Sequence, residues 1–128
     1  MVRSLMTAMV IAGLVWGTTS SAYGQKATEM YIPVGQSPGA SGKHTVIGKI
    51  EGLDPQHRTV TIAGPSGKHT ATITKRTKIW LDRSTLKLTN QKGTFSDLQV
   101  GRTVEVKYED PKQMGKGAAE WIKVQLTG

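Results

Sequence analysis

Apolar and polar residues alternate with a period of two through most of this chain from His44 onward, and this alternation restricts the fold more than any other feature. Successive side chains of a strand point to opposite faces, so a period of two is typical of strands with one buried face. The alternating runs are rich in Val, Ile and Thr, which favour strands. We therefore expect an all-β fold.

Short turns join the first three runs. Residues 54–57 read Asp-Pro-Gln-His and residues 64–67 read Gly-Pro-Ser-Gly, which are residue types that favour turns. Runs joined in this way form an antiparallel meander, and a short extended piece at residues 78–82 follows it. The residues expected on the inner face are Val46, Ile50, Val60, Ile62, Ala71, Ile73, Ile79, Leu81, Val104, Val106, Tyr108, Ile122, Val124 and Leu126.

Residues 83–100 lose the alternation. Phe95-Ser96-Asp97-Leu98, followed by Gly101, predicts one short helical turn. Two further alternating runs follow, at residues 104–108 and 122–126. Three strands, a connection with a short helical turn and two more strands match a five-stranded OB-like Greek-key barrel.

Three motifs carry a resemblance to small exported bacterial OB-like domains of unknown function. They are Gly48-Lys49-Ile50 in the first run, Thr59-Val60-Thr61-Ile62 in the second, and Leu98-x-x-Gly101-x-x-Val104-x-Val106 entering the fourth. The layout is also distantly similar to that of the periplasmic copper chaperone of the Cus efflux system. The resemblance spans residues 44–126 and is a resemblance of fold, and one fold serves many functions.

The copper chaperone implies a metal site of one His, two Met and one Trp on the second and third strands. In this sequence those strands carry threonines, and no methionine lies between Met30 and Met114. The nearest candidates for such a set are His69 and Trp80.

The first 24 residues predict export. Arg3 precedes an apolar run at residues 5–16, and a small, polar stretch follows. This order is typical of a secretory signal peptide, and the apolar run is shorter than the roughly 20 residues that cross a bilayer. Cleavage is expected before Gln25, or alternatively before Tyr23. The mature protein is then periplasmic or extracellular, with no transmembrane segment; the alternative is an uncleaved membrane anchor.

Residues 25–43 are expected to form an irregular lead-in to the barrel domain at residues 44–128, because prolines and glycines interrupt them. Within this lead-in, Tyr31, Ile32 and Val34 form an apolar patch. Such a patch is a candidate docking segment, which would add as a strand to the edge of the chain's own barrel or bind a second copy. The alternative is a disordered tether.

Composition excludes several kinds of chemistry and points to one kind of partner. The chain has no cysteine, so disulfides, thiol nucleophiles and cysteine metal sites are excluded. Its 17 Lys and Arg exceed its 9 Asp and Glu; loss of Arg3 with the signal peptide leaves 16 against 9, a net charge of +7. A basic exported protein favours an anionic ligand or protein partner. The alternative is that the charge serves solubility alone.

Trp80 and Trp121 are out of phase with the apolar residues of their strands, which predicts that both rings face outward. Exposed aromatic rings beside cations can stack bases or sugars while the cations neutralise phosphates. The alternative is that the lead-in or the long connection covers the rings. The basic residues of this candidate ligand-binding face are Lys75, Arg76, Lys78 and Lys123.

His44 and His69 are expected at the same end of the barrel, where two imidazoles would suit Cu, Ni or Zn. No carboxylate or thiolate accompanies them, so the ligand set is incomplete. No paired carboxylates, Ser-His-carboxylate set or His-Glu-x-x-His motif is readable from the spacing, so neither catalysis nor a cofactor is expected.

The sequence does not identify a specific activity. We expect an exported, non-enzymatic binding module for a ligand or a protein partner. Three alternatives stay open at this point: a nucleic-acid or polyanion binder, a periplasmic metal carrier of the copper type, and a structural subunit that assembles through its N-terminal segment.

Overall fold

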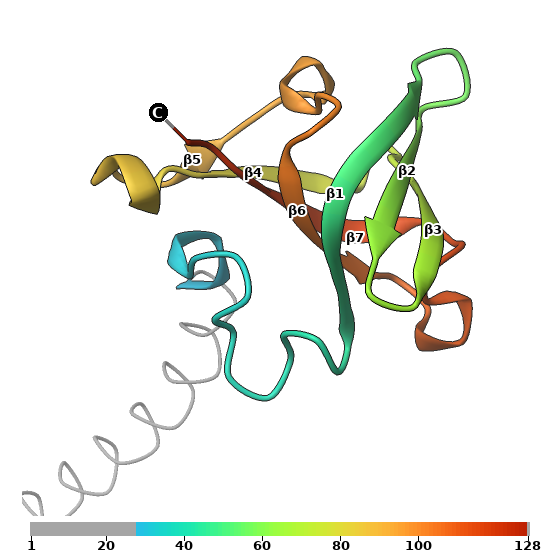
Figure 1. Ribbon diagram of the computed structural model, residues 1–128, viewed down its shortest axis with the longest axis horizontal. Helices are drawn as coiled ribbons and strands as arrows, with labels where there is room; N and C mark the ends of the chain where they lie inside the picture. Colours follow the sequence, from blue (N-terminus) through green and yellow to red (C-terminus); the bar gives the residue numbers. More distant parts are fainter. Residues whose placement is uncertain (1–27, 128) are drawn as a thin grey trace, which may run out of the picture.

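The computed structural model describes residues 28–127, which form one seven-stranded sheet in the order β3-β2-β1-β6-β7-β4-β5 (Figure 1). The predicted signal peptide and its cleavage sites lie outside the described residues. Within the described part, no helix is long and apolar enough to cross a membrane. The strands are β1 (Thr45–Asp54), β2 (Thr59–Gly64), β3 (Gly67–Thr72), β4 (Lys78–Asp82), β5 (Gln91–Lys92), β6 (Thr103–Tyr108) and β7 (Ala119–Gln125), and the short 3-10 helices are η1 (Glu29–Tyr31), η2 (Ser84–Leu86), η3 (Phe95–Asp97) and η4 (Pro111–Gln113).

The all-β prediction is confirmed, but the count of five strands is wrong. The two additional strands are β4, which corresponds to the short extended piece expected at residues 78–82, and β5, which lies in the stretch expected to be irregular; a turn separates β3 from β4. In that turn the Thr74 amide donates to Thr77 Oγ1 and the Thr77 amide donates to the Thr74 carbonyl. β4 then pairs in parallel with β7 and carries the two-residue strand β5 on its other edge.

The sheet curls because β1 is long and shared between two partners. Its first half pairs with β6 and its second half with β2, and the register shifts between Ile50 and Gly52. At the far edge, the amides of Thr70 and Thr72 donate to the carbonyls of Gly115 and Gly117, at 2.8 and 3.0 Å. The edge strand β3 is therefore joined to the segment that leads into β7.

The core lies on the inner face of the curled sheet, where the period of two predicted it. Val60, Val104, Ile122 and Val124 have no exposed area. The packing is tight where β1 begins to pair with β2, because a Cβ added at Gly48 would lie 2.2 Å from the Ala63 carbonyl oxygen. The predicted short helical turn is η3, closed by a capping box between Thr94 and Asp97.

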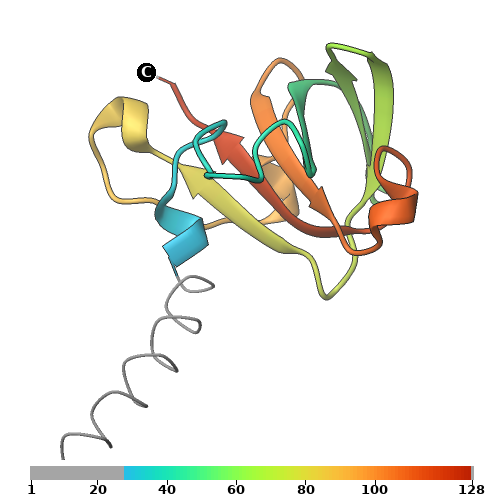
Figure 2. The same cartoon turned by 90° about the horizontal axis from the view of Figure 1, so that it is seen from below.

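The lead-in crosses the outer face of the sheet, over β4, β7 and β6 (Figure 2). It forms the short helix η1 and a series of turns, and it donates hydrogen bonds to side chains of β4 and β6. Of the two docking alternatives, packing on the chain's own domain is therefore the one that the structure shows. The expected mode of docking, strand addition at an edge, is wrong, because the segment presents single amides to carboxylates instead of a strand ladder.

Candidate functional site

Three charged side chains are fully buried on the outer face of the sheet: Asp82 on β4, Glu105 on β6 and Lys123 on β7. Glu105 lies directly opposite Lys123 in the antiparallel ladder. Charged side chains are almost never fully buried unless partners satisfy them. The partners come mainly from the lead-in, which covers these groups. We call Asp82, Glu105, Lys123 and their lead-in partners the polar layer.

Glu105 is held by three donors. Its Oε1 accepts from the Gly35 amide at 2.8 Å, and its Oε2 accepts from Ser41 Oγ at 2.6 Å and from Thr45 Oγ1 at 2.8 Å. The left-handed conformation of Gly35, with φ of 82°, turns its amide toward the sheet. A carboxylate that accepts several such bonds is compensated for the loss of water.

Lys123 is paired across the layer with a residue of η1. Its Nζ lies 3.1 Å from Glu29 Oε1, which also accepts from Ser37 Oγ at 2.5 Å. The same ammonium lies 4.8 Å from the centre of the Trp121 ring. The prediction that Lys123 is an exposed cation is therefore wrong, because this side chain is buried in an ion pair and against an aromatic face.

Asp82 completes the layer at the end of β4. Its Oδ2 accepts from the Val34 amide at 2.9 Å, and its Oδ1 accepts from the amide and the hydroxyl of Ser84 at 3.0 and 2.6 Å. Burial alone raises the pKa of Asp82, but the hydrogen bonds from Ser84 and Val34 outweigh it and lower this pKa. The consecutive amides of Val34 and Gly35 thus bind carboxylates on two different strands.

Trp80 and Trp121 lie on the outer face, as their phase predicts, but they are only 6 % and 4 % exposed. The rings stack on each other with centroids 5.4 Å apart. The prediction that these rings form an exposed stacking face is therefore wrong, because η1 packs against β4 and β5 and the lead-in covers this face. Outward-facing residues can contact either water or a polar segment of the chain. The alternation is the same in both cases, so it could not predict that the lead-in covers this face.

The other predicted basic residues lie at the start of β4 and in the turn before it. Lys75 and Lys78 are exposed and take part in none of the ion pairs found within residues 28–127. Arg76 binds Glu109 through two hydrogen bonds of 3.1 and 2.9 Å. The hydrogen bond from Arg76 lowers the pKa of Glu109. Lys75 and Lys78 are thus the free cations of the predicted set.

The histidines lie in three different settings. His44 is exposed where the lead-in meets β1. His69 Nε2 lies 3.3 Å from Ser66 Oγ, and His57 Nδ1 lies 2.7 Å from an Asp54 carboxylate oxygen. Within the described residues, no group of three or more His, Cys, Asp or Glu side chains is placed to hold a metal ion.

The predicted docking residues have unequal exposure. Tyr31 is 52 % exposed, whereas Ile32 and Val34 are half-buried. The lead-in is also held by polar bonds, including one from Asn90 Nδ2 to the Met30 carbonyl at 3.0 Å. The docking thus combines half-buried apolar side chains with polar bonds.

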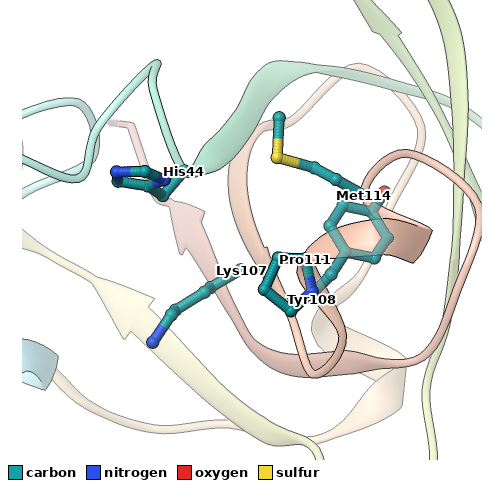
Figure 3. A pocket seen from close by; sticks show the side chains of 5 residues that line it. All are labelled: His44, Lys107, Tyr108, Pro111 and Met114. Carbon is teal, nitrogen blue, oxygen red and sulfur yellow. The ribbon is translucent and has the colours of Figure 1, made fainter.

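A small, half-open pocket of about 150 Å³ lies beside the C-terminal end of β6, and sequence reasoning missed it (Figure 3). Tyr108 forms one wall, and its hydroxyl donates to the Thr70 carbonyl at 2.9 Å. Burial raises the pKa of Tyr108 to about 12. In the sequence, this pocket is marked by a proline and a methionine within the otherwise polar loop at residues 110–117. The lining residues are His44, Lys107, Tyr108, Pro111 and Met114.

Comparison with known proteins gives little beyond this geometry. No family model matches the chain, and no curated protein matches it. Among solved structures, a copper(II)-bound variant of a CusF fragment from Escherichia coli is similar, with a TM-score of 0.44 and 18% identity. The similarity covers 64% of this chain and 90% of the fragment.

Proposed function

We propose that this chain is a non-enzymatic binding module for a polyanionic partner. The observation that carries the proposal is the distribution of charge between the polar layer and the surface. The layer removes carboxylates from the surface and leaves nearly all cations on it.

All 9 Asp and Glu and all but two of the 17 Lys and Arg lie within the described residues. Asp82 and Glu105 are buried, and Glu29 faces Lys123 inside the layer. Taking these three carboxylates from nine leaves six at the surface, whereas taking Lys123 from fifteen cations leaves fourteen. The surface is thus more positive than the composition indicates.

Several of the remaining carboxylates are already engaged. Glu109 binds Arg76, and Asp54 binds the imidazole of His57. Asp97 and Asp110 accept backbone amides at the starts of η3 and η4. Lys68 pairs with Glu51 and Lys107 with Glu120, but exposed lysines such as Lys75 and Lys78 take part in none of the ion pairs found within residues 28–127. Cations without a fixed counter-charge are the electrostatic requirement for binding phosphates or sulfates.

The exposed edge of the sheet at β4 and β5 is one place where these cations gather. Lys92 lies opposite Trp80 in the ladder, and Lys78 precedes Trp80 by two residues, so both lysines lie on the same face. Lys75 is in the adjoining turn. These three residues form what we call the edge cations.

The test uses fluorescence anisotropy with two labelled probes, a single-stranded oligonucleotide and a sulfated polysaccharide, at two salt concentrations. Affinity should fall steeply with salt, since each neutralised phosphate releases counterions. The Lys75→Glu, Lys78→Glu double variant should weaken binding more than Lys49→Glu on β1. Absence of binding to both probes at low salt would contradict the proposal.

A further inference from the structure

The pocket beside β6 combines an apolar interior with a basic surrounding, and this combination suits one kind of polyanion better than others. We propose that it receives a single base of a single-stranded nucleic acid, while neighbouring lysines neutralise the phosphates on either side. This inference rests on the proposed function and names the ligand class and the place where it binds.

The walls of the pocket suit a flat ring. Tyr108 is only 3 % exposed, and its hydroxyl is fixed on the Thr70 carbonyl, so the ring is held in one orientation. Pro111 is rigid, and Met114 is 42 % exposed with a flexible, polarizable thioether that packs well on aromatic faces. At about 150 Å³ the pocket is smaller than the roughly 300–1,000 Å³ of a typical small-molecule site, so it has room for one ring.

The lining also includes two polar side chains, those of His44 and Lys107. Figure 3 shows His44 on one side of the pocket and Met114 with Tyr108 on the other. The Lys107 ammonium lies 3.5 Å from Glu120, so this lysine contributes mainly its aliphatic stem to the lining. The exposed imidazole of His44 is left to stack on a base or to bind its edge, as histidine does with unpaired bases.

The segments that line the pocket also carry three exposed lysines close in sequence to its lining residues. Lys43 directly precedes His44, and Lys112 and Lys116 belong to the loop that supplies Pro111 and Met114. All three lysines are exposed, and none takes part in an ion pair found within residues 28–127. The opposing carboxylate in this loop, Asp110, accepts the Lys112 amide at the start of η4.

A nucleotide matches this arrangement because it carries a flat, largely apolar base and a phosphate in one unit. Acidic glycans and polyphosphate offer the charge without the base, so they would use the lysines and leave the pocket unfilled. Base stacking tolerates different sequences, because every base has a π face. Sequence preference should therefore be weak.

The experiment compares three labelled probes on the full chain: a single-stranded oligonucleotide, an abasic strand of the same length and inorganic polyphosphate. Met114→Ala should weaken oligonucleotide binding at least about five-fold, the lower end of the loss of one stacked base, and leave polyphosphate binding unchanged. The slope of affinity against salt should stay the same. His44→Ala, a second variant at an exposed position, should act in the same direction.

The matched control is Val100→Ala, which shortens another exposed apolar side chain, 64 % exposed and not part of the pocket lining. It should bind every probe as the unaltered chain does. If the abasic strand binds as tightly as the oligonucleotide, or if neither pocket variant changes oligonucleotide binding, the base-binding site is wrong while the polyanion function stands. If no probe binds at low salt, both proposals are wrong.

Discussion

Replacing Glu105 with alanine tests whether the polar layer holds the lead-in on the fold. The carboxylate has no exposed area and accepts three hydrogen bonds, from Gly35, Ser41 and Thr45. A net hydrogen bond to a charged group is worth about 1.5–3 kcal/mol, and an orphaned buried donor costs about 1–3 kcal/mol. These terms do not add fully, because the two hydroxyls can reorient. We expect Glu105→Ala to lower the free energy of unfolding by about 3–5 kcal/mol, the usual cost of breaking a buried charged network.

Urea unfolding at neutral pH measures this loss, followed by tryptophan fluorescence because Trp80 and Trp121 are buried beside Lys123 of this layer. The matched control is Glu120→Ala. Glu120 is 40% exposed and pairs with Lys107 at 3.5 Å, so its loss should cost no more than about 1 kcal/mol. Glu105→Gln should lie between the two, since it keeps the volume and one acceptor oxygen. A stability for Glu105→Ala within about 1 kcal/mol of the unaltered chain would refute the reasoning.

Four further outcomes are expected, two in the polar layer and two elsewhere in the fold. Deleting residues 29–40 should lower the melting temperature, because Asp82 and other groups of the layer lose their partners; an unchanged value would identify the lead-in as a tether. Because the pKa of Asp82 is lowered in the folded chain, its contribution to stability is present above the unfolded pKa of roughly 4 and is lost as the pH falls through the lower folded value. The loss of stability with falling pH should therefore be less steep in Asp82→Asn. The raised pKa of Tyr108 means that its contribution is present below the unfolded value of roughly 10 and is lost as the pH rises to about 12; Tyr108→Phe should flatten alkaline unfolding curves, and an unchanged curve would count against it. Gly48→Ala should cost at least about 3 kcal/mol in urea unfolding, since its Cβ would lie 2.2 Å from the Ala63 carbonyl oxygen, and a near-neutral effect would contradict that packing.

The inner face of the sheet was predictable because burial on one side forces a period of two. Val60, Val104 and Ile122 entered the core for this reason. The pairing of β4 with β7 was not predictable, because the short extended piece at residues 78–82 has the same alternation whether it is unpaired or hydrogen-bonded to a strand distant in the sequence.

The outer face shows a different limit of sequence reasoning. Trp80, Trp121 and Lys123 have the phase that the sequence predicts, yet they are buried. Their partners lie far away along the chain; Lys123 and Glu29, for example, are separated by 94 residues. Periodicity reports which side of a strand a residue faces, and it carries no information about a segment that later covers that side.

The polar layer also bears on the proposed function, because Asp82 lies on the same face of β4 as Lys78. An uncovered Asp82 would be a counter-charge near the edge cations and would compete with phosphates for them. The lead-in satisfies this carboxylate with the amide of Val34 and removes it from solvent. Since an exposed ion pair contributes little to stability, leaving Asp82 to a surface lysine would stabilise the fold less than the buried hydrogen bonds do. Docking of the lead-in therefore strengthens the fold and, by the same contacts, leaves the edge cations available to a polyanion.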